Sequence, residues 1–542
     1  MNAVEIITWP FNETNLKNIH NTEKYLNYPV IYLLKDQKEA YIGETVAFKK
    51  RMLSHLQSKE RQKLDEMHLI HHEEFNRSAT FHLETKLINY FLGDQKYKLQ
   101  NKSQTVSDIS HNYYNKQFYD RDVFREIWKG LVDKGIVSNE QHVIENRDVF
   151  KLSPFKELSV DQLELKRKVI EICENNITRT EEDKPFLYLI QGEAGVGKSV
   201  VLSSIFNTIQ ELSKDPSSIL KGTTNYLVVN HDEMLKTYKS IASKLKYLKA
   251  KNFARPTPLI NRLKNSCEKA DIIFVDEGHL LLTRPDTYNN FKENNQLEEL
   301  MKQAKIVVVV YDENQVLKLK SFWQAMTLHR LIEQADTDNY ELKNQFRMKA
   351  NDLVIEWIDH FKNKIVRPLP KDKEYEMKVF ESLQGMHQAI IEKNKVHGLS
   401  RIVSTFDYLH KKDGGIYYIN EDKGEYKIPW NITDSNYTWA EKESTIAEAG
   451  SIYTIQGFDL NYVGVILGPS VTYNGKLDRL EINPKSYKDV GAFAGVEGIE
   501  DVNAAKEKII LNSINVLMKR GIKGLYIYAS DVGLRKRLLE LE

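Results

Sequence analysis

Cysteine is almost missing from this sequence, which has only Cys173 and Cys267 in 542 residues. Two cysteines so far apart exclude a disulfide scaffold and a zinc site built from cysteine ligands. Long hydrophobic runs are missing too, since the most apolar stretch, 306–310, is far too short to span a bilayer. The stretch 1–12 lacks the basic and apolar regions of a secretory signal. We therefore expect a cytoplasmic protein with no membrane partner.

A strong excess of one charge is also absent. The formal net charge is +1, so the charge of the whole molecule cannot steer it to nucleic acid, and such binding must use local patches. Hydrophobic content of 41% and aromatic content of 10% exclude a disordered chain. A length of 542 residues exceeds what one hydrophobic core supports, so we expect several domains.

The clearest chemical motif is the stretch 192–199, which reads Gly-Glu-Ala-Gly-Val-Gly-Lys-Ser and follows the apolar run 186–190. A strand, a G-x-x-x-x-G-K-S pattern and a helix form a phosphate-binding loop. Its backbone N–H groups cradle a triphosphate, Lys198 neutralises the outer phosphates, and Ser199 offers a hydroxyl to Mg²⁺. We therefore predict ATP and Mg²⁺ as cofactors, bound by Gly192, Gly195, Gly197, Lys198 and Ser199.

Two further apolar runs end in polar side chains. The run 271–275 leads to Asp276 and Glu277, with His279 close behind. This is a Walker B pattern, in which Asp276 holds Mg²⁺ through water and Glu277 orients and deprotonates the attacking water. The run 306–310 leads to Gln315, for which a plain surface turn is the competing interpretation.

Three later segments, 340–347, 451–457 and 516–521, resemble superfamily 1 helicase motifs in their usual order. The residues of these motifs most resemble those of the bacterial Schlafen-like DNA/RNA helicase domain. The resemblance covers about residue 150 to the end. It implies two RecA-like domains with ATP in the cleft between them.

The same resemblance implies roles for single residues. Arg347 and Arg520 would be arginine fingers, and Gln456 would couple the nucleotide state to the nucleic-acid strand. Gln315 would contact the outer phosphate, and Gln162 would read the adenine edge. For the helix that begins near Gln162, a simple cap by Ser159 or Asp161 is the alternative.

The N-terminal hundred residues carry a different pattern. Strand-like runs at 29–34 and 40–43 predict a hairpin, and the stripe Phe48, Met52 and Leu56 predicts a helix. These residues resemble the GIY-YIG nuclease family, with matches at Tyr32, Tyr41, Gly43, Arg51, His55, Glu84 and Asn101.

By that resemblance, Tyr32 or Tyr41 would help to deprotonate the attacking water, and Arg51 would stabilise charge on the phosphate. Glu84 would hold one Mg²⁺ or Mn²⁺, with His55 and Asn101 in the catalytic and supporting set. An activated nucleophile, a cation and a metal are what phosphodiester cleavage needs. One position departs from the family motif, because Val30 stands where the first glycine is expected.

A basic segment, 235–267, lies between the two ATPase motifs. It has nine lysines and arginines and no acidic residue, and Tyr238, Tyr247 and Phe253 are interleaved. Cations for phosphates and aromatic faces for bases predict a track for single-stranded nucleic acid. A solvated charged face is the alternative.

Taken together, the patterns predict an α/β protein with two RecA-like parallel-sheet domains preceded by a small α+β nuclease domain. The expected boundaries are 1–105 for the nuclease, 106–150 for a helical connector, 151–335 for the first motor domain, and 336–542 for the second with insertions at 367–444 and 470–505. We expect an ATP-dependent nuclease-helicase acting on single-stranded or duplex DNA, plausibly in defence against phage DNA. The alternatives are an RNA-directed enzyme and an ATP-switched DNA-binding module with an inactive nuclease fold. The sequence leaves open whether the chain forms a homo-oligomer.

Overall fold

The computed structural model describes residues 4–19, 27–101, 113–180, 182–192, 195–321, 330–342, 348–411, 413–421, 424–432, 439–455, 458–497 and 499–542. They form two compact units. Unit 1 comprises Met1–Ile177, Ser199–Leu227 and Leu235–Phe253, and unit 2 comprises Thr178–Lys198, Val228–Met234 and Ala254–Glu542. Within the described ranges, no helix is long and apolar enough to cross a membrane.

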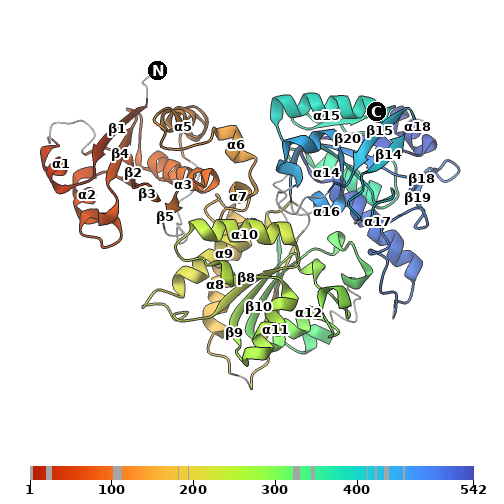
Figure 1. Ribbon diagram of the computed structural model, residues 1–542, viewed down its shortest axis with the longest axis horizontal. Coiled ribbons are helices and arrows are strands. Elements are labelled where there is room, and N and C mark those ends of the chain that lie inside the picture. The colour runs from red at the N-terminus through yellow and green to blue at the C-terminus, as the bar shows by residue number, and fades with distance from the viewer. Residues whose placement is uncertain are drawn as a thin grey trace. The chain divides into compact units, whose positions relative to one another are not determined.

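The N-terminal part of unit 1 is a five-stranded sheet of order β1-β4-β2-β3-β5 (Figure 1, red and orange). Its pairs are antiparallel except β3 with β5. The strands are β1 (Glu5–Pro10), β2 (Val30–Lys35), β3 (Glu39–Thr45), β4 (Glu66–His71) and β5 (Lys98–Leu99). The helices are α1 (Glu13–Asn18), α2 (Phe48–Leu56) and α3 (Arg77–Asp94).

The hairpin of β2 and β3 forms where the alternating pattern predicts it. Asp36 Oδ1 accepts hydrogen bonds from the backbone N–H groups of Lys38 and Glu39 at 2.6 Å, which closes the turn. Val30 is fully buried and opens β2 opposite Thr45. Its methyl groups belong to the core that also holds Phe48 and Met52, so the glycine position of the family motif is filled here by a packing residue.

Helices continue unit 1 beyond the sheet. They are α4 (Lys116–Phe118), the π-helix η2 (Tyr119–Val123), α5 (Phe124–Asp133), α6 (Gln141–Glu145), α7 (Asp148–Lys151) and α8 (Val160–Asn176). Helix α5 buries Phe124, Ile127, Trp128 and Leu131 at helical spacing.

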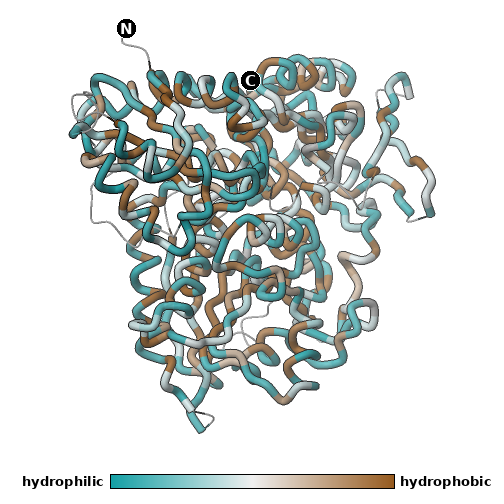
Figure 2. The backbone as a smooth tube through the Cα atoms, turned by 60° about the vertical axis from the view of Figure 1, so that its left-hand side comes forward, coloured by the Kyte–Doolittle hydropathy of each residue, from teal (hydrophilic) through white to brown (hydrophobic). Residues whose placement is uncertain are grey.

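The P-loop strand lies in a six-stranded sheet of order β11-β6-β10-β9-β7-β8. Its strands are β6 (Phe186–Gly192), β7 (Asn225–Val229), β8 (Phe253–Ala254), β9 (Ala270–Asp276), β10 (Ala304–Tyr311) and β11 (Asp336–Leu342). The helices between them are α9 (Lys198–Leu212), α10 (Asp232–Lys244), α11 (Pro256–Ser266) and α12 (Gln296–Lys302). Residues 306–310 are almost fully buried, as expected for a strand covered on both faces, and such stretches appear brown in Figure 2.

A second, seven-stranded sheet has the order β12-β20-β17-β13-β16-β15-β14. Its strands are β12 (Glu376–Val379), β13 (Arg401–Ser404), β14 (Tyr417–Glu421), β15 (Tyr426–Trp430), β16 (Ala449–Ser451), β17 (Leu460–Leu467) and β20 (Gly521–Ala529). Within the described ranges, its neighbouring strands pair in parallel except β14 with β15. The accompanying helices are α14 (Asp352–Lys362), α15 (Leu383–His397), α16 (Ile452–Ile455), α17 (Val502–Met518) and α18 (Val532–Glu540).

Two expectations about this region need correction. The segment 367–444 supplies β12, β13, β14 and β15, so it is an integral part of the second sheet and not an insertion. Strand β11 pairs in parallel with β6, so the first sheet extends past residue 335. The segment 470–505 does stand apart, because β18 (Val471–Asn474) and β19 (Arg479–Ile482) form a separate two-stranded sheet. Strand partners far away in sequence decide these points, and local patterns do not report them.

Candidate active sites

The phosphate-binding loop connects β6 to α9. Gly195 and Gly197 have φ angles of 95° and 76°, in the left-handed region that glycine adopts without strain. A Cβ atom on Gly192 would lie 3.0 Å from the Leu342 carbonyl oxygen, so this strand end also needs glycine for close packing. Residues 193 and 194 lie outside the described ranges. Lys198 and Ser199 open α9, as the motif predicts.

Lys198 is held by two oxygen atoms. Its side chain is 6% exposed, and Nζ lies 2.6 Å from the Gly192 carbonyl oxygen and 3.1 Å from Asp312 Oδ2. Asp312 comes directly after β10, the strand that pairs in parallel with both β6 and β9. Because these three strands run the same way, their carboxyl ends share one edge of the sheet, and Asp312 meets Lys198 there.

Asp312 was missed by the sequence reasoning, which selected Gln315 from the same segment. Gln315 is 4% exposed and donates a hydrogen bond from Nε2 to Asp312 Oδ2 at 2.7 Å. Burial raises the pKa of Asp312, but Lys198, His279 and Gln315 outweigh burial and hold this pKa below its ordinary value. Asp312 therefore stays ionised beside Lys198. Its position immediately after a fully apolar strand was the available signal.

The Walker B carboxylates follow β9. Asp276 is fully buried, and its Oδ1 accepts a hydrogen bond from the Glu277 backbone N–H at 2.9 Å. Glu277 has a φ of 51°, a left-handed conformation that costs a non-glycine residue about 1 to 3 kcal/mol and that gathers at functional sites. A Cβ atom on Gly278 would lie 2.8 Å from the Val310 carbonyl oxygen, so glycine is required where this turn passes β10.

His279 is fully buried, and its Nε2 lies 3.0 Å from Glu277 Oε2. Burial lowers the pKa of His279 to about 3, and the cations Lys198 and Arg520 act in the same direction. The ring is therefore neutral near pH 7, so this contact is not an ion pair between opposite charges.

Arg520 comes directly before β20 and is 1% exposed. Its Nη1 donates a hydrogen bond to the Phe458 carbonyl oxygen at 3.2 Å. Its charge adds to the effect of burial in lowering the pKa of both His279 and His231, and its role as an arginine finger stays a prediction.

Three further residues were predicted to act in the motor, namely Gln162, Arg347 and Gln456. Gln162 lies in a capping box, since its Oε1 accepts from the Ser159 backbone N–H at 3.0 Å and its own N–H donates to Ser159 Oγ at 3.2 Å. The cap alternative therefore describes this helix start, and the adenine role stays a prediction. Arg347 and Gln456 lie outside the described residues.

A magnesium ion fits the motor site without a dedicated metal cluster. Among the residues that the structure describes, no three His, Cys, Asp or Glu side chains gather into a metal-binding group. Magnesium bound with a nucleotide takes most of its ligands from phosphate oxygens and water. The buried carboxylate of Asp276 and the hydroxyl of Ser199 have the hard oxygen atoms needed for the rest.

The N-terminal candidate site centres on the hydroxyl of Tyr32, whose side chain is fully buried in β2. Arg51 Nε donates a hydrogen bond to Tyr32 Oη at 3.2 Å, and His55 Nε2 lies 2.9 Å from the same oxygen. Arg61 Nη1 lies 2.9 Å from His55 Nδ1. Because an arginine can only donate, Nδ1 accepts, and we assign the ring proton to Nε2, which donates to Tyr32.

Glycine at position 43 makes this arrangement fit. Gly43 pairs with Tyr32 across the hairpin. A Cβ atom on Gly43 would lie 2.2 Å from Tyr32 Oη and 2.3 Å from Cζ, distances at which atoms overlap. The glycine of the second motif is thus required by the tyrosine of the first, which links the two halves of the pattern physically.

Tyr41 and Arg61 complete the wall of this site. The ring centroids of Tyr41 and His55 are 5.2 Å apart, and the Arg61 guanidinium carbon lies 3.8 Å above the Tyr41 ring. Burial lowers the pKa of His55 to about 3, and Arg61 and Arg51 add to this effect, so the imidazole is neutral. Arg61 was not singled out from the sequence, although a basic residue six positions after His55 was visible.

Glu84 lies on α3 and Asn101 follows β5, and their roles as metal ligand and support stay predictions. Burial raises the pKa of Glu84 to about 8, with Glu44 adding to the effect and Arg51 opposing it. A divalent cation would stabilise the ionised form of a carboxyl group whose pKa is raised in this way. Asn101 accepts from the Ile42 backbone N–H at 3.1 Å and donates to the Ile42 carbonyl at 2.8 Å, which fixes β3 between Tyr41 and Gly43.

Two of the three aromatic residues predicted for the basic segment 235–267 do not present exposed faces, while Tyr247 is half-buried. Tyr238 and Phe253 are buried and stack on each other with centroids 5.7 Å apart, so their rings belong to the core. Lys264 forms ion pairs with Glu293 and Glu299 at 2.6 Å. The exposed cations, including Lys239 and Lys249, can still meet phosphates. Tyr238 lies in α10 and Phe253 in β8, and both rings are buried.

Comparison with known proteins places the chain in a family. The model of the Schlafen group 3 DNA/RNA helicase domain matches residues 185–531, more than half of the chain. The uncharacterized protein YPL245W of Saccharomyces cerevisiae is 40% identical over 428 residues, which cover 73% of this chain and 93% of that protein.

Two solved structures also align. The Pif1 helicase from Candida albicans aligns at 13% identity over 71% of this chain and 97% of that one, with a TM-score of 0.29. The Pif1 helicase from Bacteroides in complex with ADP-AlF3 and ssDNA aligns at 10% identity over 68% of this chain and 93% of that one, with a TM-score of 0.27. The match over residues 185–531 decides the family: this chain belongs to the Schlafen group 3 DNA/RNA helicase domain family.

Proposed function

We propose that this chain is an ATP-dependent nuclease-helicase that translocates on DNA and cleaves it. The observation that carries the proposal is the Tyr32 cluster, in which Gly43 makes room for a hydroxyl that Arg51 and His55 both contact. A merely structural hairpin has no need for such a polar group in its core. Membership of the Schlafen group 3 DNA/RNA helicase domain family supports the helicase part of the proposal.

In the motor, Lys198 would exchange Asp312 for the outer phosphates of ATP. Both partners are anionic oxygens, so the buried ammonium keeps a counterion throughout. Glu277 would accept a proton from the attacking water, and Arg520 would stabilise charge on the transferring phosphoryl group. Mg²⁺, when bound through Asp276 and Ser199, supplies charge neutralisation on the phosphates.

In the nuclease, Arg51 would stabilise charge on the scissile phosphate, because its guanidinium is exposed while its Nε is fixed by Tyr32. Burial raises the pKa of Tyr32, with Arg51 opposing, so the phenol keeps its proton. Because its oxygen already accepts from Arg51 and His55, it would orient water by donating its O–H. Tyr41 is then the better candidate for taking part in deprotonation. Mg²⁺ or Mn²⁺, when held by Glu84, supplies positive charge near the leaving oxygen.

RNA is the alternative substrate, because the family description names both nucleic acids. A role in defence against phage DNA follows from the pairing of a nuclease with a motor in one chain, and an unchanged plating efficiency of phage on cells that express the protein would contradict it. The oligomeric state is left to measurement.

The proposal is tested with labelled DNA and matched RNA, each as a single strand, a forked duplex and a full duplex, with Mg²⁺ or Mn²⁺. We expect ATPase stimulation by DNA and metal-dependent cleavage that Glu84→Ala abolishes. Glu74→Ala is the matched control, since Glu74 is exposed and its hydrogen bonds with Tyr119 and His72 use backbone atoms. Strand-stimulated ATPase without cleavage under either metal would replace the nuclease by a binding module. Stimulation by RNA alone would assign the motor to RNA.

A further inference from the structure

A cavity of about 230 Å³ lies in unit 1, and none of the residues assigned to the two candidate active sites lines it. Its walls come from α3, the π-helix η2, the chain that leads into α8, and α9. Most of its lining is apolar and aromatic, with the rings of Phe81, Tyr90, Phe150 and Phe155. A concave, mostly apolar space with a few polar groups is the usual form of a small-molecule site.

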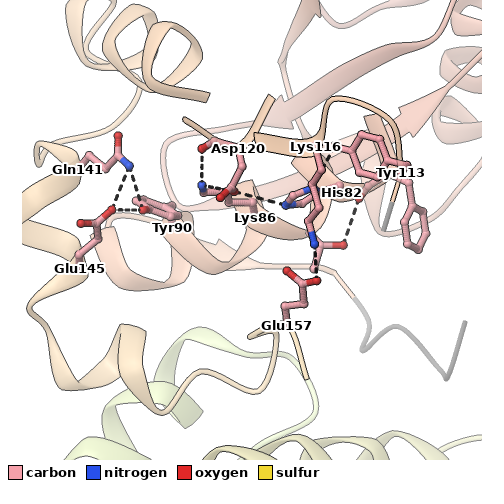
Figure 3. A network of polar contacts seen from close by, with 11 residues as sticks. His82, Lys86, Tyr90, Tyr113, Lys116, Asp120, Gln141, Glu145 and Glu157 are labelled. Carbon is pink, nitrogen blue, oxygen red and sulfur yellow. Dashed lines mark hydrogen bonds and ion pairs between the residues drawn. The ribbon is translucent and has the colours of Figure 1, made fainter. Parts of the chain in front are cut away.

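Most charged groups around this cavity are already paired, as Figure 3 shows. Lys86 Nζ lies 2.5 Å from Asp120 Oδ1 and donates to the Asp120 carbonyl oxygen at 2.7 Å. His82 Nε2 lies 3.5 Å from the same carboxylate. Lys116 forms an ion pair with Glu157 at 2.8 Å. These groups fix the shape of the wall and leave little charge for a ligand.

Two lining groups are different. Lys166 is 3% exposed, and its ammonium donates a hydrogen bond to Ser204 Oγ at 3.0 Å. Among the described residues no carboxylate forms an ion pair with it. Asn89 is 7% exposed, and its Oδ1 has no hydrogen-bond partner within the described part of the chain. Burial destabilises the Lys166 ammonium, with the Glu211 charge opposing this effect without an ion pair, and a buried amide oxygen without a donor is unfavourable too.

A ligand that satisfies both groups must bring an anion for Lys166 and an N–H donor for Asn89. The aromatic walls suit a planar ring, which gains dispersion and quadrupole energy from such contacts. A nucleobase joined to a phosphate combines all three properties, because bases stack on aromatic side chains and carry hydrogen-bond donors on their edges. The volume of about 230 Å³ accommodates a ligand of this size and not a strand.

We propose that this cavity binds a free mononucleotide, with its base against the aromatic walls and beside Asn89 and its phosphate at Lys166. The site stands independently of the proposed nuclease-helicase activity. Its location nevertheless matters, since α3 carries Glu84 and α9 begins at Lys198. A bound mononucleotide would contact the helices of both candidate sites.

The test is titration calorimetry on the full chain carrying Lys198→Ala, which removes nucleotide binding at the P-loop. The probes are AMP, GMP, CMP and UMP, with inorganic phosphate and the corresponding nucleosides as separate arms. We expect one equivalent of at least one monophosphate to bind, and Lys166→Met and Asn89→Leu each to weaken that binding about 10-fold to 100-fold. Lys168→Met is the matched control, because Lys168 is an exposed lysine on α8 that pairs with Glu164.

Absence of binding by all four monophosphates in the Lys198→Ala protein would overturn the proposal. Unchanged affinity in the folded Asn89→Leu and Ser204→Ala proteins would overturn it too. These two variants provide the test if Lys166→Met does not fold. A dinucleotide that binds as tightly as the best monophosphate would contradict a free mononucleotide and assign the cavity to a strand end. Inorganic phosphate binding as tightly as the monophosphates would contradict the role of the base.

Discussion

Replacing Gly43 by alanine tests the N-terminal site with a single methyl group. In the native hairpin the new Cβ atom would lie 2.2 Å from Tyr32 Oη, so either the Tyr32 ring or β3 must move. The substitution adds no backbone strain from a left-handed φ, because Gly43 is absent from the residues with positive φ. Any effect therefore comes from the displaced phenol.

The structure sets the size of the effect. Overpacking of this kind costs about 1 to 3 kcal/mol, and moving the phenol also breaks its hydrogen bonds to Arg51 and His55, each worth about 1 kcal/mol. We therefore expect the free energy of local opening of the hairpin to fall by about 3 to 5 kcal/mol. Cleavage should fall about 100-fold, because a displacement of about 1 Å in a catalytic constellation has that consequence.

Hydrogen exchange of the β2 and β3 amides measures the first effect, and metal-dependent strand cleavage measures the second. The ATPase activity should not change. Gly475→Ala is the matched control, since a Cβ atom there meets nothing closer than 3.7 Å. Cleavage and exchange both equal to wild type in Gly43→Ala would refute the claim that this glycine positions Tyr32.

Three further predictions concern the motor and its second sheet. Asp312→Asn removes the carboxylate beside the buried Lys198 ammonium and should destabilise the nucleotide-free protein by about 3 to 5 kcal/mol. ADP with Mg²⁺ should then raise the melting temperature more than in wild type. An equal rise would contradict the exchange of counterions. Arg520→Lys should lower kcat of the ATPase by about 10³-fold, and an unchanged kcat would remove Arg520 from the finger role. Burial raises the pKa of Asp407 to about 6, so the folded state holds this proton more tightly than the unfolded state, and stability should fall by about 3 kcal/mol as pH rises from about 4 to about 6. Asp407→Asn should abolish that fall in denaturant titrations across this range, and parallel pH profiles would show that another group titrates.

Much of the local structure could be predicted from the sequence. The P-loop and the hairpin of β2 and β3 are defined by short patterns, because glycine placement and the alternation of apolar residues act over a few positions. The pairing of Gly43 with Tyr32 could not be read in this way, although both residues were singled out. Their contact depends on the register of the hairpin.

Partners that are distant in sequence account for most of the rest. Lys198 meets Asp312 because β10 lies beside β6, and 114 positions separate the two residues. Tyr238 and Phe253 match the composition of a nucleic-acid track but stack inside the core, because buried helix faces and exposed stacking platforms use the same aromatic residues. Asn89 and Lys166 look ordinary in their helices, and only the walls of the cavity set them apart.

The proposed function requires that one chain holds two separable active sites, one for cleavage and one for ATP hydrolysis. The most direct measurement follows unwinding and cleavage of one end-labelled forked DNA by wild type, Glu84→Ala and Lys198→Ala, with Mg²⁺ or Mn²⁺, with and without ATP. We predict that Glu84→Ala hydrolyses ATP and unwinds the fork without cutting, while Lys198→Ala loses ATPase and unwinding and cuts only in an ATP-independent manner. Cleavage that survives Glu84→Ala, or that is absent from wild type, would contradict the account.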